Sequence, residues 1–405
     1  MPEGNVQAEQ QLLFNPFEPG FIENPYPAYQ RLRDAAAAHE SPFGIWVLSQ
    51  YEDVAAILRS DQSADPRKVS DGLFRDQFDR LENGIRRMSM LDRDPPDHTR
   101  LRRLVAKVFT PRSIAAMEPM ITELVDTRLD QMADSGTADV VDELAFPLPF
   151  EVISRMLGMP PTDTARVREL SGTMVRALEI IADQELLAVI AAAADEFHAI
   201  IREVIAWKRE RPADDLLTAL IAAEEDGDTL TEGELIAQIQ LLFIAGHETT
   251  VNLIGGGVYG LLRNPDQLAL LRRRPDLADN AVEELLRYVG PVQFSRRVTI
   301  SPYQVADREI PPGKFVVAIL ASANRDERFW GPDAGKLRLD RENARQHVSF
   351  GAGPHHCLGA SLARLEARVS IERLVRRFPD LAAAGDVEWN GRVNLRGPAH
   401  LPVAV

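Results

Sequence analysis

The residues best suited to chemistry lie in one stretch, residues 350–360, which reads FGAGPHHCLGA. It contains Cys357, the only cysteine among 405 residues, so no internal disulfide can form. A single cysteine can ligate a metal, act as a nucleophile or simply fill the core, and core filling is the common case. The glycines of this stretch allow the backbone to approach a bulky group closely, which favours a ligand.

A helix is predicted directly after the cysteine, because apolar residues recur there at helical spacing. They are Leu358, Leu362, Leu365 and Val369. Cys357 should therefore lie at a helix N-terminus, where unpaired N–H groups and the helix dipole favour a thiolate. A thiolate in a glycine-rich loop suits a soft metal centre.

Two metal centres are compatible with this loop. His355, His356 and Cys357 could contribute to a zinc site, but three consecutive residues rarely converge on one ion, and no second Cys or His cluster completes the set. An iron porphyrin requires only one axial protein ligand. The sequence therefore favours haem over zinc.

Residues 350–359 fill the pattern Phe-Gly-x-Gly-x-His-x-Cys-x-Gly and closely resemble the haem-binding signature of the cytochrome P-450 haem-thiolate monooxygenases. The resemblance implies haem b (iron protoporphyrin IX) with Cys357 as the iron ligand and His355 on a propionate. Phe350, Gly351 and Gly359 would shape the haem-binding loop. The implied fold is mainly α with small β-sheets: a triangular helical prism with a long central helix over the haem.

That central helix is predicted to begin at the capping box formed by Thr231 and Glu234. One face then carries residues at steps of three and four, namely Leu235, Ile239, Leu242, Gly246, Thr249 and Leu253. A glycine and a hydroxyl interrupt this apolar stripe. On residue type alone, they indicate a bend or close helix packing.

Residues 245–250, AGHETT, resemble the oxygen-activation motif of the same family. The resemblance implies three catalytic residues. Gly246 would leave room for dioxygen, Thr249 would donate a hydrogen bond to it, and Glu248 would relay protons inward through water.

Basic residues at two further places are expected to hold the haem propionates. His98 and Arg102 lie four residues apart, on one face of the helix predicted after Pro95 and Pro96. An exposed basic helix would explain this pair equally well, but the family resemblance implies propionate binding. By the same resemblance Arg297 is a further propionate ligand, with Arg296 as the alternative.

The resemblance implies two other groups of residues. Glu284 and Arg287 match a Glu-x-x-Arg element and should form a buried structural pair; its third basic member stays open among Arg341, Arg345 and His347. The expected pocket walls are Leu242, Ala245, Val292, Phe294 and Leu395. Residues 61–90, with Phe74, Phe78 and Ile85, are a further candidate for substrate contact.

Composition limits the class of protein. No linker or repeat divides the chain, so we expect one domain over residues 1–405, with residues 1–20 as a flexible extension. A net charge of −15 argues against nucleic acid as a partner. No apolar segment is long enough for a membrane anchor, so we expect a monomeric, cytoplasmic protein.

The resemblance implies a monooxygenase that inserts one atom of O2 into a small to medium apolar substrate, as in bacterial secondary metabolism. Electrons would pass from NAD(P)H through a ferredoxin reductase and a ferredoxin. Basic residues form an acid-free cluster suited to an acidic ferredoxin: Arg100, Arg103, Lys107 and Arg112, followed by Arg364 and Arg368. A peroxide-driven peroxygenase and a non-catalytic haem-thiolate sensor are the alternatives.

Overall fold

The computed structural model describes residues 14–70, 88–107, 109–160, 164–179, 183–225 and 228–405. Helices dominate this part of the chain, which confirms the expected mainly α fold. They are α1 (Tyr26–Ala35), α2 (Tyr51–Arg59), α4 (Asp97–Ala106), α5 (Pro111–Ala115), α6 (Glu118–Ala133), α7 (Pro147–Leu157), α8 (Thr164–Met174), α9 (Gln184–Glu210), α10 (Leu216–Ile221), α11 (Glu232–Leu262), α12 (Pro265–Arg273), α13 (Ala278–Val289), α14 (Leu320–Ala323), α15 (Glu327–Trp330) and α16 (Ala360–Arg377). Short 3-10 or π-helical turns include η3 (Met90–Asp92), η4 (Val141–Ala145), η5 (Val175–Leu178) and η8 (Gly353–His355).

The strands form small sheets. The largest has the order β1-β2-β9-β6, with β1 (Ala38–Glu40), β2 (Trp46–Leu48), β9 (Phe315–Ala318) and β6 (Ser295–Val298). A second has the order β10-β13-β3, with β10 (Ala382–Ala383), β13 (Pro402–Ala404) and β3 (Thr137–Asp139). The two-stranded pairs are β4 (Glu224–Glu225) with β5 (Asp228–Thr229), β7 (Tyr303–Val305) with β8 (Arg308–Ile310), and β11 (Glu388–Trp389) with β12 (Pro398–His400).

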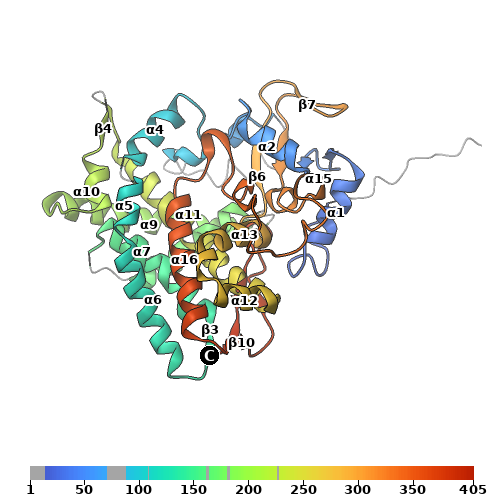
Figure 1. Ribbon diagram of the computed structural model, residues 1–405. Helices are drawn as coiled ribbons and strands as arrows, with labels where there is room; N and C mark the ends of the chain where they lie inside the picture. Colours follow the sequence, from blue (N-terminus) through green and yellow to red (C-terminus); the bar gives the residue numbers. More distant parts are fainter. Residues whose placement is uncertain (1–13, 71–87, 108, 161–163, 180–182, 226–227) are drawn as a thin grey trace, which may run out of the picture.

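The elements separate into two sides (Figure 1). Helices α5, α6, α7 and α10 occupy the left of the view, while α1, α2 and β6 lie to the right, with α16 upright between them. Among the helices that the structure describes, none is long and apolar enough to cross a membrane.

The predicted central helix is α11, with 31 residues. The Thr231 hydroxyl accepts from the Glu234 N–H, and the Glu234 carboxylate accepts from the Thr231 N–H, so the capping box is present. Apolar residues in its first half, including Phe243, pack with α7 and α9. Those in its second half, including Ile254, pack with α6, α13 and α16. The region between these two cores is free to line a cavity.

Three consecutive glycines let α11 approach three neighbours. A Cβ added at Gly255 would lie 3.0 Å from Cγ of Pro398, and one at Gly257 would lie 3.1 Å from Cδ1 of Ile371. At Gly256 the nearest atom would be in Val289, at 3.5 Å. The triplet therefore serves close packing of β12, α16 and α13 around one helix.

Residues 1–13 lie outside the described residues, as do Phe74, Phe78 and Ile85. Of the extension expected over residues 1–20, Phe14 and Pro16 are buried, while Phe17, Pro19 and Gly20 are exposed. The Phe14 ring is 9 % exposed and stacks against Tyr29, with ring centroids 6.5 Å apart. This aromatic contact places Phe14 against α1, and the flexibility of residues 1–20 stays a prediction.

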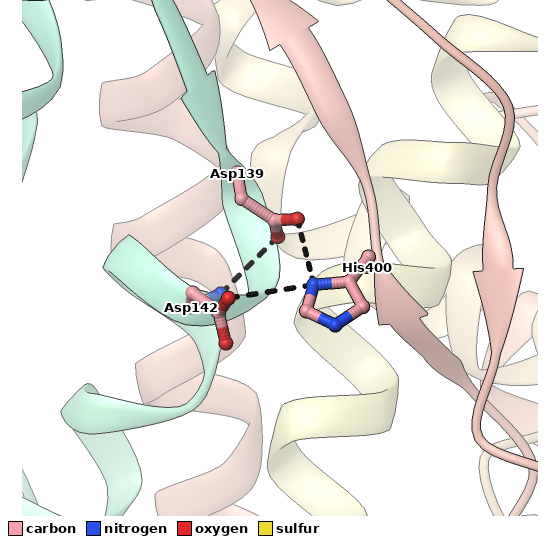
Figure 2. Close-up of side chains that lie close together, drawn as sticks. All are labelled: Asp139, Asp142 and His400. Atoms are coloured by element: carbon pink, nitrogen blue, oxygen red, sulfur yellow. Dashed lines mark hydrogen bonds and ion pairs between the residues drawn. The ribbon is translucent and has the colours of Figure 1, made fainter.

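Asp139, Asp142 and His400 join η4 to the C-terminal strands (Figure 2). Oδ1 of Asp139 accepts from the N–H of Val141 at 2.8 Å and from that of Asp142 at 3.2 Å. Oδ2 of Asp139 lies 3.1 Å from Nδ1 of His400, and this bond raises the pKa of the imidazole. These contacts hold β12 next to η4. They also anchor the end of the loop between β11 and β12, which reaches the interior.

Candidate active site

A cavity of about 780 Å³ lies between the middle of α11 and the loop before α16. Cys357 lines it, as do Gly246 and Thr249 of α11. The five residues expected as pocket walls all line it too: Leu242, Ala245, Val292, Phe294 and Leu395. Segments far apart in the sequence thus meet at one space.

The Cys357 loop is held in an unusual backbone shape by glycine. Gly351 and Gly353 have φ of +68° and +69°, which favours glycine. A Cβ at Gly353 would come within 2.6 Å of the Leu58 carbonyl oxygen. The Cys357 N–H donates to the Phe350 carbonyl oxygen at 2.9 Å, which closes the loop and leaves the thiol facing the cavity.

The electrostatics of Cys357 differ from the sequence-based expectation. The helix α16 begins at Ala360, so the thiol lies before the helix and its contact is the Gly359 N–H. Burial raises the pKa of the thiol; the Gly359 N–H, Arg102 and Arg364 oppose this increase without cancelling it. The positive charge of a bound metal ion would favour the thiolate.

Four basic side chains converge beside the thiol: His98, Arg102, Arg297 and His355 all line the cavity. The rings of His98 and His355 lie 4.0 Å apart, and Nη2 of Arg102 donates to the His356 carbonyl oxygen at 2.6 Å. Burial and the positive neighbours lower the pKa of His355 to about 3. Nε2 of His98 is buried and lacks a hydrogen-bond partner among the described residues.

The two neighbouring arginines have different partners. Arg296 pairs with Asp92 at 2.5 Å. The Arg297 guanidinium is buried and donates to the carbonyl oxygens of Arg296, at 2.7 Å, and Leu58, at 3.2 Å. Burial lowers its pKa to about 10. Arg297 thus presents a poorly compensated positive charge at the cavity.

These observations fit haem. The cavity has one thiol on its wall, and the glycines of the loop carry no side chains that would keep a bulky group away from the backbone. Anionic groups would compensate the positive charge of the basic cluster. Haem b brings two propionates and an iron ion that accepts one axial ligand. The residues present therefore match the cofactor in both shape and charge.

On α11, the motif residues do not all face the cavity. Thr249 does, and its hydroxyl donates to the Ala245 carbonyl oxygen at 2.7 Å. Gly246 also lines the cavity, yet a Cβ there would lie 3.2 Å from Cδ1 of Ile153, so its small size also serves packing of α7. His247 points away and contacts the Phe146 carbonyl oxygen through Nε2 at 3.0 Å.

Glu248 is buried and forms an ion pair with Arg392, in the loop between β11 and β12. Burial raises the pKa of the Glu248 carboxyl, while Arg392 acts in the opposite direction. The acid of the motif is therefore held by a residue 144 positions later in the chain. No local pattern in the sequence marks Arg392.

The cavity roof is tied to the C-terminal loop by Glu179. Its carboxylate accepts from three consecutive backbone N–H groups, those of Val393, Asn394 and Leu395, at 3.0, 2.8 and 2.8 Å. Leu395 is thereby held in the cavity wall. The sequence analysis missed Glu179, and also several apolar wall residues: Phe14, Phe43, Ile153, Leu178, Phe315 and Val317.

Glu284 and Arg287 form a fully buried ion pair behind the site. Nε and Nη2 of Arg287 donate to the carboxylate, both at 2.7 Å. The third basic member is Arg341, whose Nε lies 3.1 Å from Glu284. The other two candidates, Arg345 and His347, contact Glu283 instead.

Comparison with known proteins agrees with this geometry. The sequence model of the family described as Cytochrome P450 matches residues 41–386. Cytochrome P450 107B1 of Saccharopolyspora erythraea is 42 % identical over 405 residues, covering 96 % of both chains.

Two solved structures superpose over nearly the whole chain. The bacillaene polyketide synthase cytochrome P450 PksS of Bacillus subtilis has a TM-score of 0.87 at 35 % identity, covering 96 % of this chain and 99 % of that one. P450BioI, in complex with an acyl carrier protein carrying hexadec-9Z-enoic acid, has a TM-score of 0.88 at 34 % identity, covering 95 % and 99 %. The chain therefore belongs to the cytochrome P450 family and is a haem b-dependent, oxygen-incorporating oxidoreductase.

Proposed function

We propose that this enzyme inserts one atom of O2 into a small to medium apolar substrate, with the second atom leaving as water after uptake of two electrons and two protons. One observation carries the proposal. The cavity between Cys357 and Thr249 is large and mostly walled by apolar side chains, such as Leu242 and Phe294. Such a pocket binds a hydrocarbon skeleton and excludes water.

The substrate class we favour is a polyketide or a related hydrocarbon skeleton of bacterial secondary metabolism. The support is similarity to PksS, a polyketide synthase P450, together with the apolar walls. P450BioI was crystallised with an acyl chain on a carrier protein, so a carrier-bound substrate is the second form to test.

The residues contribute binding, orientation and proton delivery. Bound haem supplies the binding and reductive activation of dioxygen. Cys357 would be its axial ligand, while His98, Arg102, Arg297 and His355 would bind the propionates. Arg297 is preferred over Arg296, which is occupied by Asp92.

Proton delivery is assigned to two residues of α11. Thr249 is the donor within the cavity, because it lines this space. To donate there, its hydroxyl must turn away from the Ala245 carbonyl oxygen that it now contacts. Glu248 is the proton source behind it. Burial raises the pKa of its carboxyl, which favours the protonated acid, and Arg392 holds the group in place.

The function is tested with labelled dioxygen. Candidate substrates are first selected by the change they cause in the ferric spectrum. With NADPH, ferredoxin, its reductase and ¹⁸O2, the product should gain one ¹⁸O atom, and added catalase should not slow the reaction. In the Thr249→Ala variant, NADPH should still be consumed while product falls about 10²-fold and peroxide appears.

Thr250→Ala is the matched control, since the Thr250 hydroxyl makes an equivalent bond to the Gly246 carbonyl oxygen, at 3.0 Å. This variant should keep product formation coupled to NADPH. Loss of product on adding catalase would instead support the peroxygenase alternative, and fully coupled turnover by Thr249→Ala would remove that hydroxyl from the mechanism.

We propose that the electrons come from a ferredoxin bound next to the Cys357 loop. The first four basic residues were expected to be free of acids, and this is wrong for Arg100; Arg364 and Arg368 of α16 are also paired. Arg100 pairs with Glu234 and Asp228, Arg364 with Glu283, and Arg368 with Glu118. Arg103, Lys107 and Arg112 are exposed, and Arg112 is the residue chosen for charge reversal.

Reversing one of these charges should slow reduction. In Arg112→Glu, formation of the reduced carbon monoxide complex by ferredoxin should be about tenfold slower at low ionic strength, and the difference should shrink as salt is added. Stopped-flow absorbance measures this rate. Arg31→Glu is the control, because α1 lies at the opposite side of the molecule from α5 (Figure 1). Equal slowing in both variants would contradict a local docking site.

A further inference from the structure

Glu366 is a buried carboxyl group that the proposed reaction does not use. It lies on α16, two turns after the Cys357 loop, and is 2 % exposed. It lines the same cavity as Cys357. Its Oε2 lacks a hydrogen-bond partner among the described residues.

The surroundings of Glu366 offer no compensating charge. One turn later, the Ser370 side chain is also buried, and its hydroxyl is unpartnered among the described residues. Burial alone raises the pKa of Glu366, to about 8, and no charged group contributes. An ionised carboxylate in such a place is unfavourable, so the neutral acid is the resting form at neutral pH.

Several ionisable groups on the helices packed against α16 contact other residues. Asp126 and Asp130 of α6 bind Arg373 and Arg377, and His247 of α11 contacts the Phe146 carbonyl oxygen. Glu118 of α6 binds Arg368, while Glu283 of α13 binds Arg364 and His347. Glu284 of α13 binds Arg287, and Glu248 of α11 binds Arg392. Arg112 of α5, and Arg272 and Arg273 of α12, are exposed. Besides Cys357, the other ionisable groups of the cavity are the basic cluster assigned to the propionates, the Asp92–Arg296 ion pair, His356 and Glu179 at the roof.

Haem bound in this cavity would share its low-dielectric interior with Glu366. Reduction adds one negative charge to the haem, and a carboxylate in the same cavity opposes that charge. By linkage, the carboxyl must then bind its proton more tightly in the reduced protein than in the oxidised protein.

We propose that Glu366 is a redox-linked proton-binding residue, neutral in the reduced protein and ionised in the oxidised protein as the pH rises. One electron passes from the reductant to the haem and one proton passes from water to a Glu366 carboxylate oxygen. The O–H bond is the only covalent bond formed. The inference depends on haem binding and not on the substrate or the ferredoxin proposed above.

Spectroelectrochemistry of the haem-loaded protein tests this with small-molecule mediators, without substrate or ferredoxin. Between about pH 6 and pH 10, a range that brackets the pKa of Glu366, the reduction equilibrium constant should fall by up to tenfold per pH unit, or about 59 mV. In Glu366→Gln, which keeps the shape and cannot ionise, the part of that fall that Glu366 causes should disappear. At the acid end of this pH range, where Glu366 is neutral, the wild-type protein and the variant should have the same reduction potential.

Propionates and histidines also titrate, so the comparison with Glu366→Gln isolates the residue. If both proteins show the same pH dependence, or if the potential of the wild-type protein is constant, the inference is overturned. Should Glu366→Gln not retain haem, redox-difference infrared spectra of wild-type protein with ¹³C-labelled glutamate decide the matter. A protonated glutamate carbonyl band that appears on reduction at alkaline pH supports the inference, and its absence overturns it.

Discussion

A Cys357→Ser variant is expected to form no oxygenated product and to lack the strongly red-shifted Soret band of the reduced carbon monoxide complex. The band and the reaction both require a thiolate on iron, which a serine hydroxyl cannot replace. The fold should survive, because the loop is closed by the backbone bond between Cys357 and Phe350 and by its glycines. The optical spectrum of the dithionite-reduced, carbon monoxide-treated protein provides the measurement.

His356→Gln is the matched control for that variant. The contact of His356 with Arg102 is made through the backbone carbonyl oxygen, so a new side chain should leave the carbonyl band in place. A zinc site built from residues 355–357 would instead respond to both variants and show no haem spectrum. A normal band in Cys357→Ser would overturn the ligand assignment.

Replacing Arg287 with methionine is expected to lower the free energy of unfolding by about 3–5 kcal/mol. The guanidinium is fully buried, with two bonds to Glu284 and others to the carbonyl oxygens of Asn324, Ala334 and Lys336. Removing the guanidinium leaves a buried carboxylate whose remaining partners are the Arg341 side chain and the Arg338 N–H, and it takes a donor from three carbonyl oxygens. Because a typical domain is stable by about 5–15 kcal/mol, much of the protein should fail to retain haem.

Denaturant unfolding of the purified holoprotein, followed by haem absorbance and circular dichroism, measures this loss. Arg338→Met is the control: its pair with Asp333 lies at the surface, with 47 % of the arginine side chain exposed, so the loss should be under about 1 kcal/mol. In the double variant Glu284→Gln with Arg287→Met, part of the stability should return. Equal losses for Arg287→Met and Arg338→Met would contradict a structural role for the buried pair.

The sequence predicted features that depend on residues close together in the chain. The capping box at Thr231 identified the start of α11, and the loop at residues 350–359 indicated both the cofactor and the fold. Residues singled out within such motifs, such as Thr249 and His355, meet at one cavity.

Contacts between distant segments were not predictable in the same way. Arg100 seemed free of acids because Asp228 and Glu234 are more than 120 positions away. Arg392 stands in no recognisable motif, yet it is the partner of Glu248. Glu366 lies between Arg364 and Arg368, a pattern typical of a solvent-exposed helix face. It is nevertheless buried, and this results from the packing of α16, which the sequence does not show.

The glycine triplet of α11 has a consequence for attempts to give the enzyme new substrates by directed evolution. One half of the helix offers side chains such as Leu242 and Ala245 to an open space, where larger or smaller residues can be sampled freely. At Gly255 and Gly257 even alanine would press against Pro398 and Ile371. Mutant libraries should therefore randomise Leu242 and Ala245 and keep the glycine triplet unchanged.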